Sequence, residues 1–231
     1  TGSIVGSPSL PQGYSLVNGY IVGPDVNLSG ADLSGADLSG VDLSGVRTGS
    51  IVGSPSLPQG YSLVNGYIVG PDVNLTWANL SGTDLSGVDL SGADLNSVRT
   101  GSIVGSPSLP QGYSLVNGYI VGPDVNLSWV NLSGADLSGV DLSGANLSGV
   151  FTGSIVGSPS LPQGYSLVNG YIVGPDVNLT WANLSGTDLS GVDLSGADLN
   201  SVRTGSIVGS PSLPQGYSLV NGYIVGPDVN L

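Results

Sequence analysis

The residues of this sequence best suited to chemistry are aspartates that recur at every fifth position. The chain has 16 acidic residues, all of them Asp, and Asp84, Asp89 and Asp94 illustrate the constant spacing. Two carboxylates held together can act as a general acid and base, and a row of them can hold cations. Here each carboxylate is one of many equivalent copies, so no pair marks a unique site. The spacing therefore predicts no catalytic residue and no enzyme activity.

The residue types needed for other common sites are missing. The chain contains no His, no Cys and no Met. A Ser-His-Asp triad, a cysteine nucleophile, a disulfide framework and a zinc site are therefore excluded. The sequence predicts no cofactor-binding residue and no metal-binding residue.

Aspartates that stack on one another would repel. If their side chains form columns about 5 Å apart, each like-charged pair costs on the order of 0.8 kcal/mol in water. On one interpretation the carboxylates only keep a flat surface solvated. A column bridged by Ca²⁺ is the alternative, although no loop has the ligand spacing of an EF-hand.

The overall charge limits the choice of partners. The formal net charge is −13 at pH 7, with only three basic residues. Binding nucleic acid through its phosphates needs clusters of basic residues, which this chain lacks. No apolar stretch reaches the roughly 18 residues of a membrane-spanning helix. Nucleic acid, a membrane and a small-molecule substrate are therefore not predicted partners.

The element that carries the aspartates also repeats a leucine at every fifth position. Leucine returns at Leu75, Leu80 and Leu85, and a small residue such as Ala78 or Thr83 stands two places before each later leucine. A period of five fits neither a helix nor the alternation of a strand. A short fixed period is typical of a solenoid, in which each coil packs on the next.

The repeated pattern, seen in Ala31-Asp32-Leu33-Ser34-Gly35, resembles the bacterial pentapeptide-repeat proteins. The resemblance covers a little under half of the chain. It implies an all-β fold, a right-handed parallel β-helix with four pentapeptides per coil. It also implies that the leucine and the small residue point inward. The leucines expected to form the core ladder are Leu33, Leu38, Leu85, Leu90, Leu137, Leu142, Leu189 and Leu194.

The pentapeptide runs alternate with an unvarying segment, here called the constant segment, which spans Thr1 to Asn27 and begins again at Thr48, Thr100, Thr152 and Thr204. Four pentapeptides follow it in the first unit, and five in each of the next three. The sequence ends at the start of another run, as expected of an excerpt from a longer array. We predict one continuous solenoid made of units 1–47, 48–99, 100–151 and 152–203 and a partial unit 204–231.

The constant segment allows two interpretations. The stretch from Thr1 to Gln12 is rich in Gly and Pro and reads as a loop, whereas Tyr14 to Val22 reads as a hairpin turning at Asn18-Gly19. Alternatively, Leu16, Ile21 and Val26 continue the period of five, which places Asn18 in a leucine position within the coil. The arithmetic slightly favours the coil, with the stretch up to Gln12 as a surface insertion or a loosened coil. On this interpretation the shorter first unit turns all later features by a quarter turn.

Three tryptophans interrupt the pentapeptide pattern. Trp77, Trp129 and Trp181 recur at a constant interval, once per unit, and replace the glycine seen at Gly30. The constant interval predicts a single column of outward-facing rings. Such rings either cover a loop of their own unit or join neighbouring molecules, because exposed apolar patches mark contacts. Phe151, which replaces an Arg of the other units, could add to such a contact.

The sequence therefore predicts a structural protein rather than an enzyme. Near-identical units without a unique site favour part of a self-associating fibre or filament, extracellular or at the cell surface. One alternative is an acidic interaction module, since the resemblance includes pentapeptide-repeat proteins that mimic DNA and bind a type II topoisomerase. A designed consensus array is the other alternative.

Overall fold

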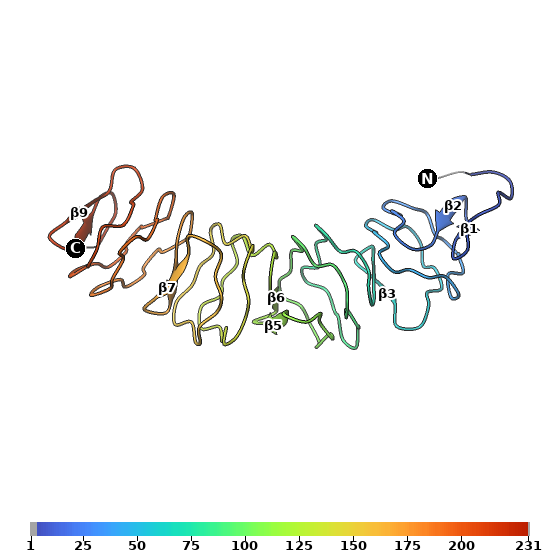
Figure 1. Cartoon of the computed structure of the whole chain (residues 1–231), viewed down its shortest axis with the longest axis horizontal. Helices are drawn as coiled ribbons and strands as arrows, with labels where there is room; N and C mark the ends of the chain where they lie inside the picture. The colour runs from blue at the N-terminus through green and yellow to red at the C-terminus, as the bar shows by residue number, and fades with distance from the viewer. Residues whose placement is uncertain (1–3, 231) are drawn as a thin grey trace. The chain divides into compact units, whose positions relative to one another are not determined.

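A computed structural model describes residues 4–230 of the chain, which falls into two compact units, Thr1–Ile120 and Val121–Leu231. Within each unit the backbone winds in successive coils (Figure 1). Residues 4–230 contain no helix, and their only regular strands are short. The predicted all-β solenoid with recurring hairpin segments is confirmed.

The pentapeptide runs form the coils that the resemblance implies, because residues four pentapeptides apart lie side by side. Parallel bridges join Asn27 to Arg47 and Asp32 to Val52. In the second bridge, the N–H of Leu33 donates to the Val52 carbonyl and the Val52 N–H donates to the Ala31 carbonyl, both at 2.9 Å. Four pentapeptides therefore make one four-sided turn, and in the turn that begins at Asn74 each side carries a single parallel bridge.

The core of each coil is a column of leucines flanked by small residues. Alternation around the outward Asp or Asn turns the residues on either side of it inward, as at Ala31 and Leu33, which are 1% and 0% exposed. Fully burying one leucine side chain contributes about 1.5–3 kcal/mol. The eight leucines of the expected core ladder, which are Leu33, Leu38, Leu85, Leu90, Leu137, Leu142, Leu189 and Leu194, are all 0% exposed.

The first part of the constant segment forms sides of a coil, which agrees with the loosened coil and excludes the surface insertion, the two alternatives for this stretch. Val52 bridges to Asp32 and Ser56 bridges to Asp37, so residues that read as a loop form two sides of a turn. Thr48 and Ile51 are buried at 5% and 8% exposure, and they take the inward positions of the leucine and of the small residue, respectively. The strict period is lost at Ser56, because it takes the bridge to Asp37 that the period would give to Leu57.

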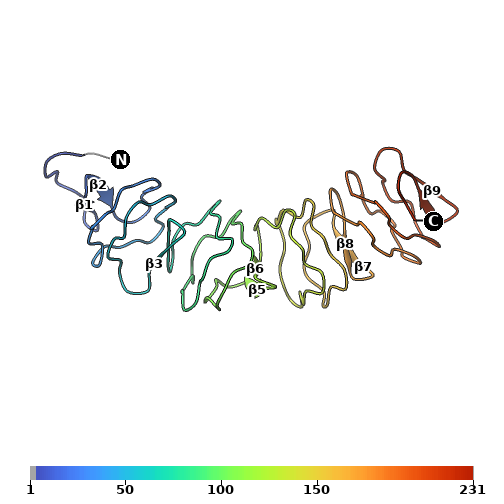
Figure 2. The same ribbon diagram turned by 180° about the vertical axis from the view of Figure 1, so that it is seen from behind.

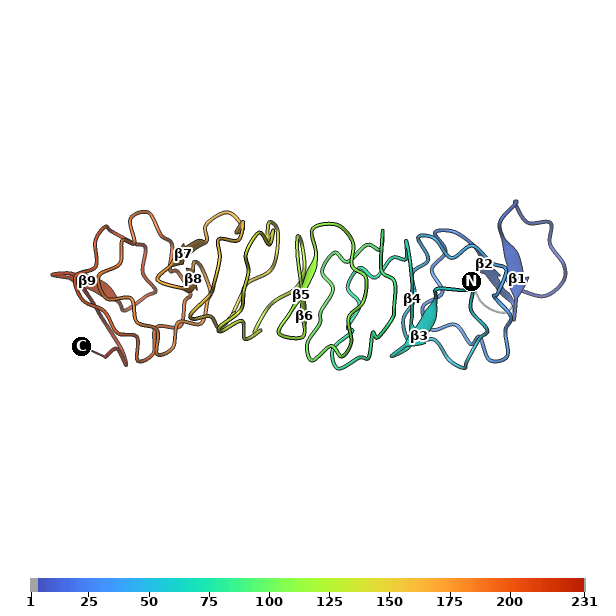
Figure 3. The ribbon, with the colours of Figure 1, turned by 90° about the horizontal axis from the view of Figure 1, so that it is seen from below.

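The remaining side of each constant segment carries a β-hairpin. In β1 and β2, Leu16 pairs with Ile21 across an antiparallel ladder. Asn18 and Gly19 form the turn with φ of 48° and 79°, the left-handed conformations that a two-residue hairpin turn requires. The interpretation of this stretch as two further sides of the coil, slightly favoured by the arithmetic, is therefore wrong. Figure 2 and Figure 3 show the equivalent strands β7 and β8 side by side. The strands are β1 (Ser15–Val17), β2 (Tyr20–Val22), β3 (Ser62–Val64), β4 (Tyr67–Val69), β5 (Ser114–Val116), β6 (Tyr119–Val121), β7 (Ser166–Val168), β8 (Tyr171–Val173), β9 (Ser218–Val220) and β10 (Tyr223–Val225).

A buried hydroxyl group binds each of the hairpins β3–β4, β5–β6, β7–β8 and β9–β10 to its coil. The backbone N–H of Ile68, in β4, donates to the Thr48 hydroxyl at 2.8 Å. A buried N–H without an acceptor would cost about 1–3 kcal/mol. At the hairpin tip, the Ile51 N–H donates to the Gly66 carbonyl at 3.1 Å. These bonds anchor the hairpin in the middle of β4 and at its tip.

An aromatic ring closes the base of the hairpin. The Tyr61 hydroxyl donates to the Pro71 carbonyl at 3.1 Å. A Cβ atom added to Gly70 would overlap the ring of Tyr61. Glycine is therefore required at this position by the closeness of the ring.

A coil that contains a constant segment closes one full turn with a longer stretch of chain than a pentapeptide coil. Arg47 stacks on Asn27 after four pentapeptides, and Asn74 stacks on Arg47 after the whole constant segment. The first unit, with four pentapeptides, therefore contains whole turns only. Each later unit has a fifth pentapeptide and advances by one further side of the solenoid.

This advance is visible within the second compact unit. Phe151 lies between Asn131 and Asn178, whereas the equivalent Arg203 lies between Asn183 and Asn230. Asn183 is one pentapeptide beyond Asn178, so Arg203 stands on the next side of the coil. Features that recur once per unit are thus displaced by a quarter turn. The quarter turn that the sequence assigned to the short first unit belongs to the longer units.

Candidate functional site

The aspartates cap the corners of the coils and are not assembled into a site. The Asp32 carboxylate accepts the Ser34 N–H at 3.0 Å, and the same bond recurs in other pentapeptides. Hydrogen bonds from the Ser34 hydroxyl and then from its N–H lower the pKa of Asp32 below its ordinary value, so the carboxylate remains ionised. Within residues 4–230, no three carboxylates gather as a metal-binding group.

The bridges also separate the aspartates from one another. Asp32 is bridged to Val52 and Asp37 to Ser56, because a coil that carries a constant segment lies against the pentapeptide coil. In the bridges of Asn74 with Asp94 and of Asn178 with Asp198, the carboxylate is paired with an amide. These bridges do not form the columns of stacked carboxylates expected from the sequence, so the repulsion within each of them is small.

The tryptophans occupy strained corners. Trp77, Trp129 and Trp181 have φ of 66°, 63° and 65°, in the left-handed region, where Gly30 has φ of 73°. This conformation costs a residue with a side chain roughly 1–2 kcal/mol. The three side chains are nevertheless 68%, 75% and 70% exposed, so burial recovers little of that cost. Exposed aromatic groups at strained positions are candidates for a functional contact.

The ring of Trp129 lies over the corner of the next coil. A Cβ atom added to Gly149 would overlap its indole. The backbone N–H of Trp129 donates to the Ser148 carbonyl of the same neighbouring coil at 2.9 Å. The ring of Trp129 therefore lies against a pentapeptide corner of its own unit.

The expected single column of tryptophans is not formed in the second compact unit. Trp129 follows Asn126, which bridges to Asn146, whereas Trp181 follows Asn178, which bridges to Phe151. These bridges lie on adjacent sides of the solenoid. The two rings are therefore a quarter turn apart, because a unit with five pentapeptides does not contain a whole number of turns.

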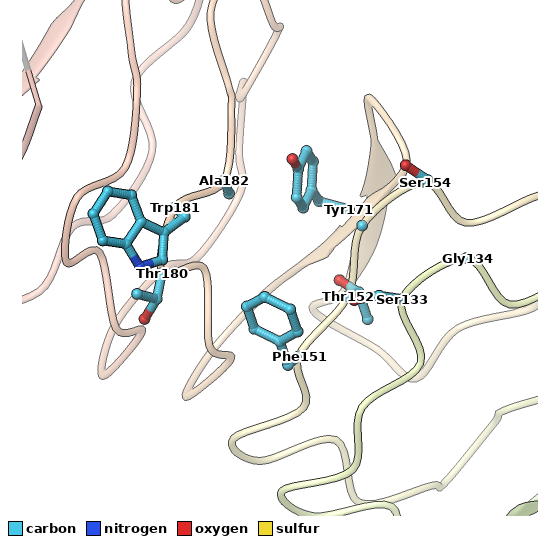
Figure 4. Close-up of a pocket in the computed structure, with 10 residues that line it drawn as sticks. Ser133, Gly134, Phe151, Thr152, Ser154, Tyr171, Thr180, Trp181 and Ala182 are labelled. Carbon is cyan, nitrogen blue, oxygen red and sulfur yellow. The ribbon is translucent and has the colours of Figure 1, made fainter. Parts of the chain in front are cut away.

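A cleft of about 410 Å³ opens where the coil of residues 151–177 meets the next pentapeptide run. Three aromatic residues border it, namely Phe151, Tyr171 from β8, and Trp181. Figure 4 shows the rings of Phe151 and Tyr171 on the side of the constant segment and Trp181 on the opposite side. The other lining residues are Ser133, Gly134, Thr152, Gly153, Ser154, Thr180 and Ala182.

The same cleft occurs in the first compact unit, also with a volume of about 410 Å³. Trp77 and Tyr67 take the places of Trp181 and Tyr171, and Arg47 takes the place of Phe151. The Arg47 guanidinium donates to the Thr76 carbonyl at 3.3 Å, which holds it along the wall of the cleft. The cleft is thus a repeated feature of the chain.

The hairpin creates the cleft by separating two coils at a corner. The Tyr67 hydroxyl accepts the Asn79 N–H at 3.3 Å, and the Asn65 side chain donates to the Asn79 carbonyl at 3.4 Å. The hairpin therefore stands between the coil of Val52 and the coil of Asn79 where direct backbone pairing would otherwise continue. A Cβ atom added to Gly49 would lie 3.3 Å from the ring of Tyr67, so glycine leaves room for the tyrosine.

The sequence identified only part of this site. It singled out Trp77, Trp181 and Phe151, and the structure places the last two around one cleft. It did not identify Tyr67 or Tyr171, because the hairpin was one of two open interpretations and its distance from the pentapeptide corner was unknown. The Asn-Gly turn was the signal that could have placed them.

Neither cleft has the groups needed for acid–base or nucleophilic catalysis. No carboxylate lines the cleft around Phe151 or the one around Arg47. Hydroxyl groups without a neighbouring base are weak nucleophiles. The arrangement of both clefts suits the binding of a ligand.

Among residues 4–230 there is no apolar helix of the length that a membrane span requires.

Comparison with known proteins agrees with the repeat architecture. The family model described as "Pentapeptide repeats" matches in eight copies, over residues 24–47, 72–99, 124–151 and 176–203. No curated protein matches the chain. One similar solved structure is that of HetL, a pentapeptide repeat protein involved in heterocyst differentiation regulation from the cyanobacterium Nostoc sp. strain PCC 7120. It is 20% identical over 87% of this chain and 90% of that chain, with a TM-score of 0.23, and this likeness is too weak to inform function.

The family matches fall on the leucine-filled pentapeptide runs, and the constant segments lie mostly between them. The coil of four pentapeptides, the buried leucines and the eight matched copies agree with one another. The chain therefore contains pentapeptide repeats, which the family model matches over a little under half of its length.

Proposed function

We propose that this protein is a structural element, part of a long fibre built by stacking of solenoid repeats, outside the cell or at its surface. The observation that carries the proposal is the continuous stacking of coils along one side of the first compact unit. Asn27, Arg47, Asn74 and Asp94 follow one another along one side, through both pentapeptide coils and a constant segment. Further units of the same kind could be added without altering the core.

The tryptophan corners supply contacts between such fibres. Each indole is largely exposed, and each occupies a strained corner that glycine fills at Gly30. Because these corners recur, individually weak contacts would add along an array by multivalency. The same argument supports self-association over the binding of one partner at a unique surface.

Electron microscopy and sedimentation of the native material test this proposal. Filaments that bundle laterally are the expected result for the natural protein. Replacing Trp77, Trp129 and Trp181 together with Gly should reduce bundling and leave the far-ultraviolet circular dichroism unchanged, because Gly30 shows that glycine fits this corner. A matched control, Val156→Ser, removes an exposed apolar side chain outside the clefts and should bundle normally. A native preparation containing only isolated monomers would overturn the proposal.

The net charge of −13 and the exposed aspartates favour one second candidate, an acidic module that competes with DNA for a type II topoisomerase. Neutral residues such as Val52 and Ser56 interrupt the rows of carboxylates, which weakens the imitation of a phosphate backbone. Inhibition of supercoiling by stoichiometric amounts of the protein, without filament formation, would favour this candidate over the fibre.

A further inference from the structure

We propose that the repeated aromatic cleft binds a neutral saccharide. The site is the cleft of about 410 Å³ beside Phe151, Tyr171 and Trp181, together with its counterpart beside Arg47, Tyr67 and Trp77. This volume lies in the range of small-molecule sites, about 300–1,000 Å³. Saccharide binding by the clefts does not depend on fibre formation.

The first argument is the chemistry of the lining. The cleft beside Phe151 combines aromatic rings with the hydroxyl-bearing residues Ser133, Ser154 and Thr180. Sugar rings present apolar C–H faces and a rim of hydroxyl groups. Amphipathic aromatic rings suit such faces, and serine or threonine hydroxyls can both donate to and accept from the rim.

The second argument is charge. The chain has 16 acidic residues, yet none of them lines either cleft. The cleft beside Phe151 contains no charged side chain. In the other cleft, the Arg47 guanidinium is already engaged with the Thr76 carbonyl. A neutral ligand fits both linings, whereas the surrounding charge of −13 opposes an anion.

The third argument is the backbone of the tryptophan. Trp181 has a φ of 65° and remains 70% exposed, so the fold retains a costly conformation that leaves the indole in solvent. The ring stands on the opposite wall from Phe151 and Tyr171 in Figure 4. A flat ligand in the cleft would cover aromatic surface on both walls. Burial of that surface would recover the cost of the corner.

The test is a titration of the whole chain with three uncharged tetrasaccharides, made of glucose, mannose or N-acetylglucosamine. Isothermal calorimetry measures binding, and tryptophan fluorescence shows whether the indoles are at the site. We expect at least one of the three to bind and to shift the emission. An anionic tetragalacturonate of similar length should bind at least about tenfold more weakly.

Two variants locate the site. The combined Trp77→Gly, Trp129→Gly and Trp181→Gly variant should weaken saccharide binding by at least about tenfold, measured by calorimetry. The Val156→Ser control should bind as the natural protein does, because Val156 is exposed and lies outside the cleft.

Three outcomes would overturn the inference. The first is the absence of binding for all three tetrasaccharides up to about 10 mM. The second is equal binding by the tryptophan variant. The third is tryptophan-dependent self-association without saccharide binding, which would mean that the clefts hold a second copy of the chain. If the protein binds a saccharide but forms no filaments, the saccharide site in the cleft is supported and only the proposed fibre function is rejected.

Discussion

The buried threonine at the start of each of the four later constant segments should control the stability of the hairpin that follows it. Thr48, Thr100, Thr152 and Thr204 are 2–7% exposed, and each hydroxyl accepts the N–H of a buried isoleucine at 2.8–3.0 Å. Valine has nearly the same shape as threonine but cannot accept a hydrogen bond. Replacing all four threonines with Val therefore leaves four buried N–H groups without their acceptors.

The expected magnitude follows from the cost of an unsatisfied buried donor. That cost is about 1–3 kcal/mol per site, which corresponds to about 5-fold to 150-fold in an opening equilibrium. Hydrogen exchange of the peptide Tyr-Ile-Val-Gly measures it directly. This peptide occurs five times, so the amides of Ile68, Ile120, Ile172 and Ile224 report the change together, and Ile21 adds one copy whose threonine is not replaced.

Threonine to serine is the matched control. Serine keeps the acceptor oxygen and removes only a methyl group, worth about 0.8 kcal/mol. The isoleucine amides should therefore remain protected in the serine variant and exchange faster in the valine variant. Equal exchange rates in the two variants would refute the assignment of this hydrogen bond as the anchor of the hairpin.

Three further predictions concern other parts of the fold. Gly70→Ala should lower the thermal midpoint by several degrees, because the new Cβ atom displaces the Tyr61 ring, whereas Gly40→Ala, with no neighbour within 4 Å, should change it little. Trp77→Gly should stabilise the fold by up to about 1 kcal/mol in urea titrations, because it removes the left-handed strain of about 1–2 kcal/mol, while the greater conformational entropy of unfolded glycine offsets part of that gain. A large loss of stability would show that the tryptophan corner is not strained. The pKa of carboxylates such as Asp84 and Asp136 is lowered in the fold, first by the hydroxyl and then by the N–H of the serine two residues on. The stability that these carboxylates contribute is therefore complete above the unfolded pKa of about 3.9, and it is lost as the pH falls through the lower folded pKa. The thermal midpoint should therefore decrease as the pH is lowered from about 5 to about 2. An increase of the midpoint on the same acidification would show that repulsion between the carboxylates dominates.

The pentapeptide coils could be predicted because each position has one dominant constraint. Leucine at a fixed interval fills the interior, and the small residue before Asp32 or Asp84 is buried beside it. These constraints act within one coil, so the sequence period reveals them directly.

The constant segment was harder to predict because the hairpin has the residue spacing of a coil, and the stretch that forms coil sides has the composition of a loop. Leu16 and Ile21 have the spacing of neighbouring pentapeptide positions, yet they are cross-strand partners in a hairpin with a two-residue turn. Conversely, Val46 and Ile51 keep the inward register of the pentapeptides, but Thr48 stands where a leucine is expected. The first pattern slightly favoured a coil over the hairpin, and the second left a loop, a surface insertion and a loosened coil as alternatives.

The clefts could not be predicted because they depend on how far the constant segment turns the chain. Nothing in the spacing of residues shows that one constant segment closes one turn, as the stacking of Asn74 on Arg47 demonstrates. Without that fact, the constant interval between tryptophans suggested a straight column. The quarter turn between Trp129 and Trp181 is therefore a result of the tertiary structure.

The number of pentapeptides between constant segments determines the direction in which the next hairpin and cleft face. Four pentapeptides leave the next hairpin and cleft pointing in the same direction, and five turn them by one side. Gain or loss of a single pentapeptide in the coding sequence would thus redirect the cleft that follows it and leave the packing of each coil unchanged. Repeat-number variation could in this way generate new orientations of an unchanged site, without any substitution in the residues that form it.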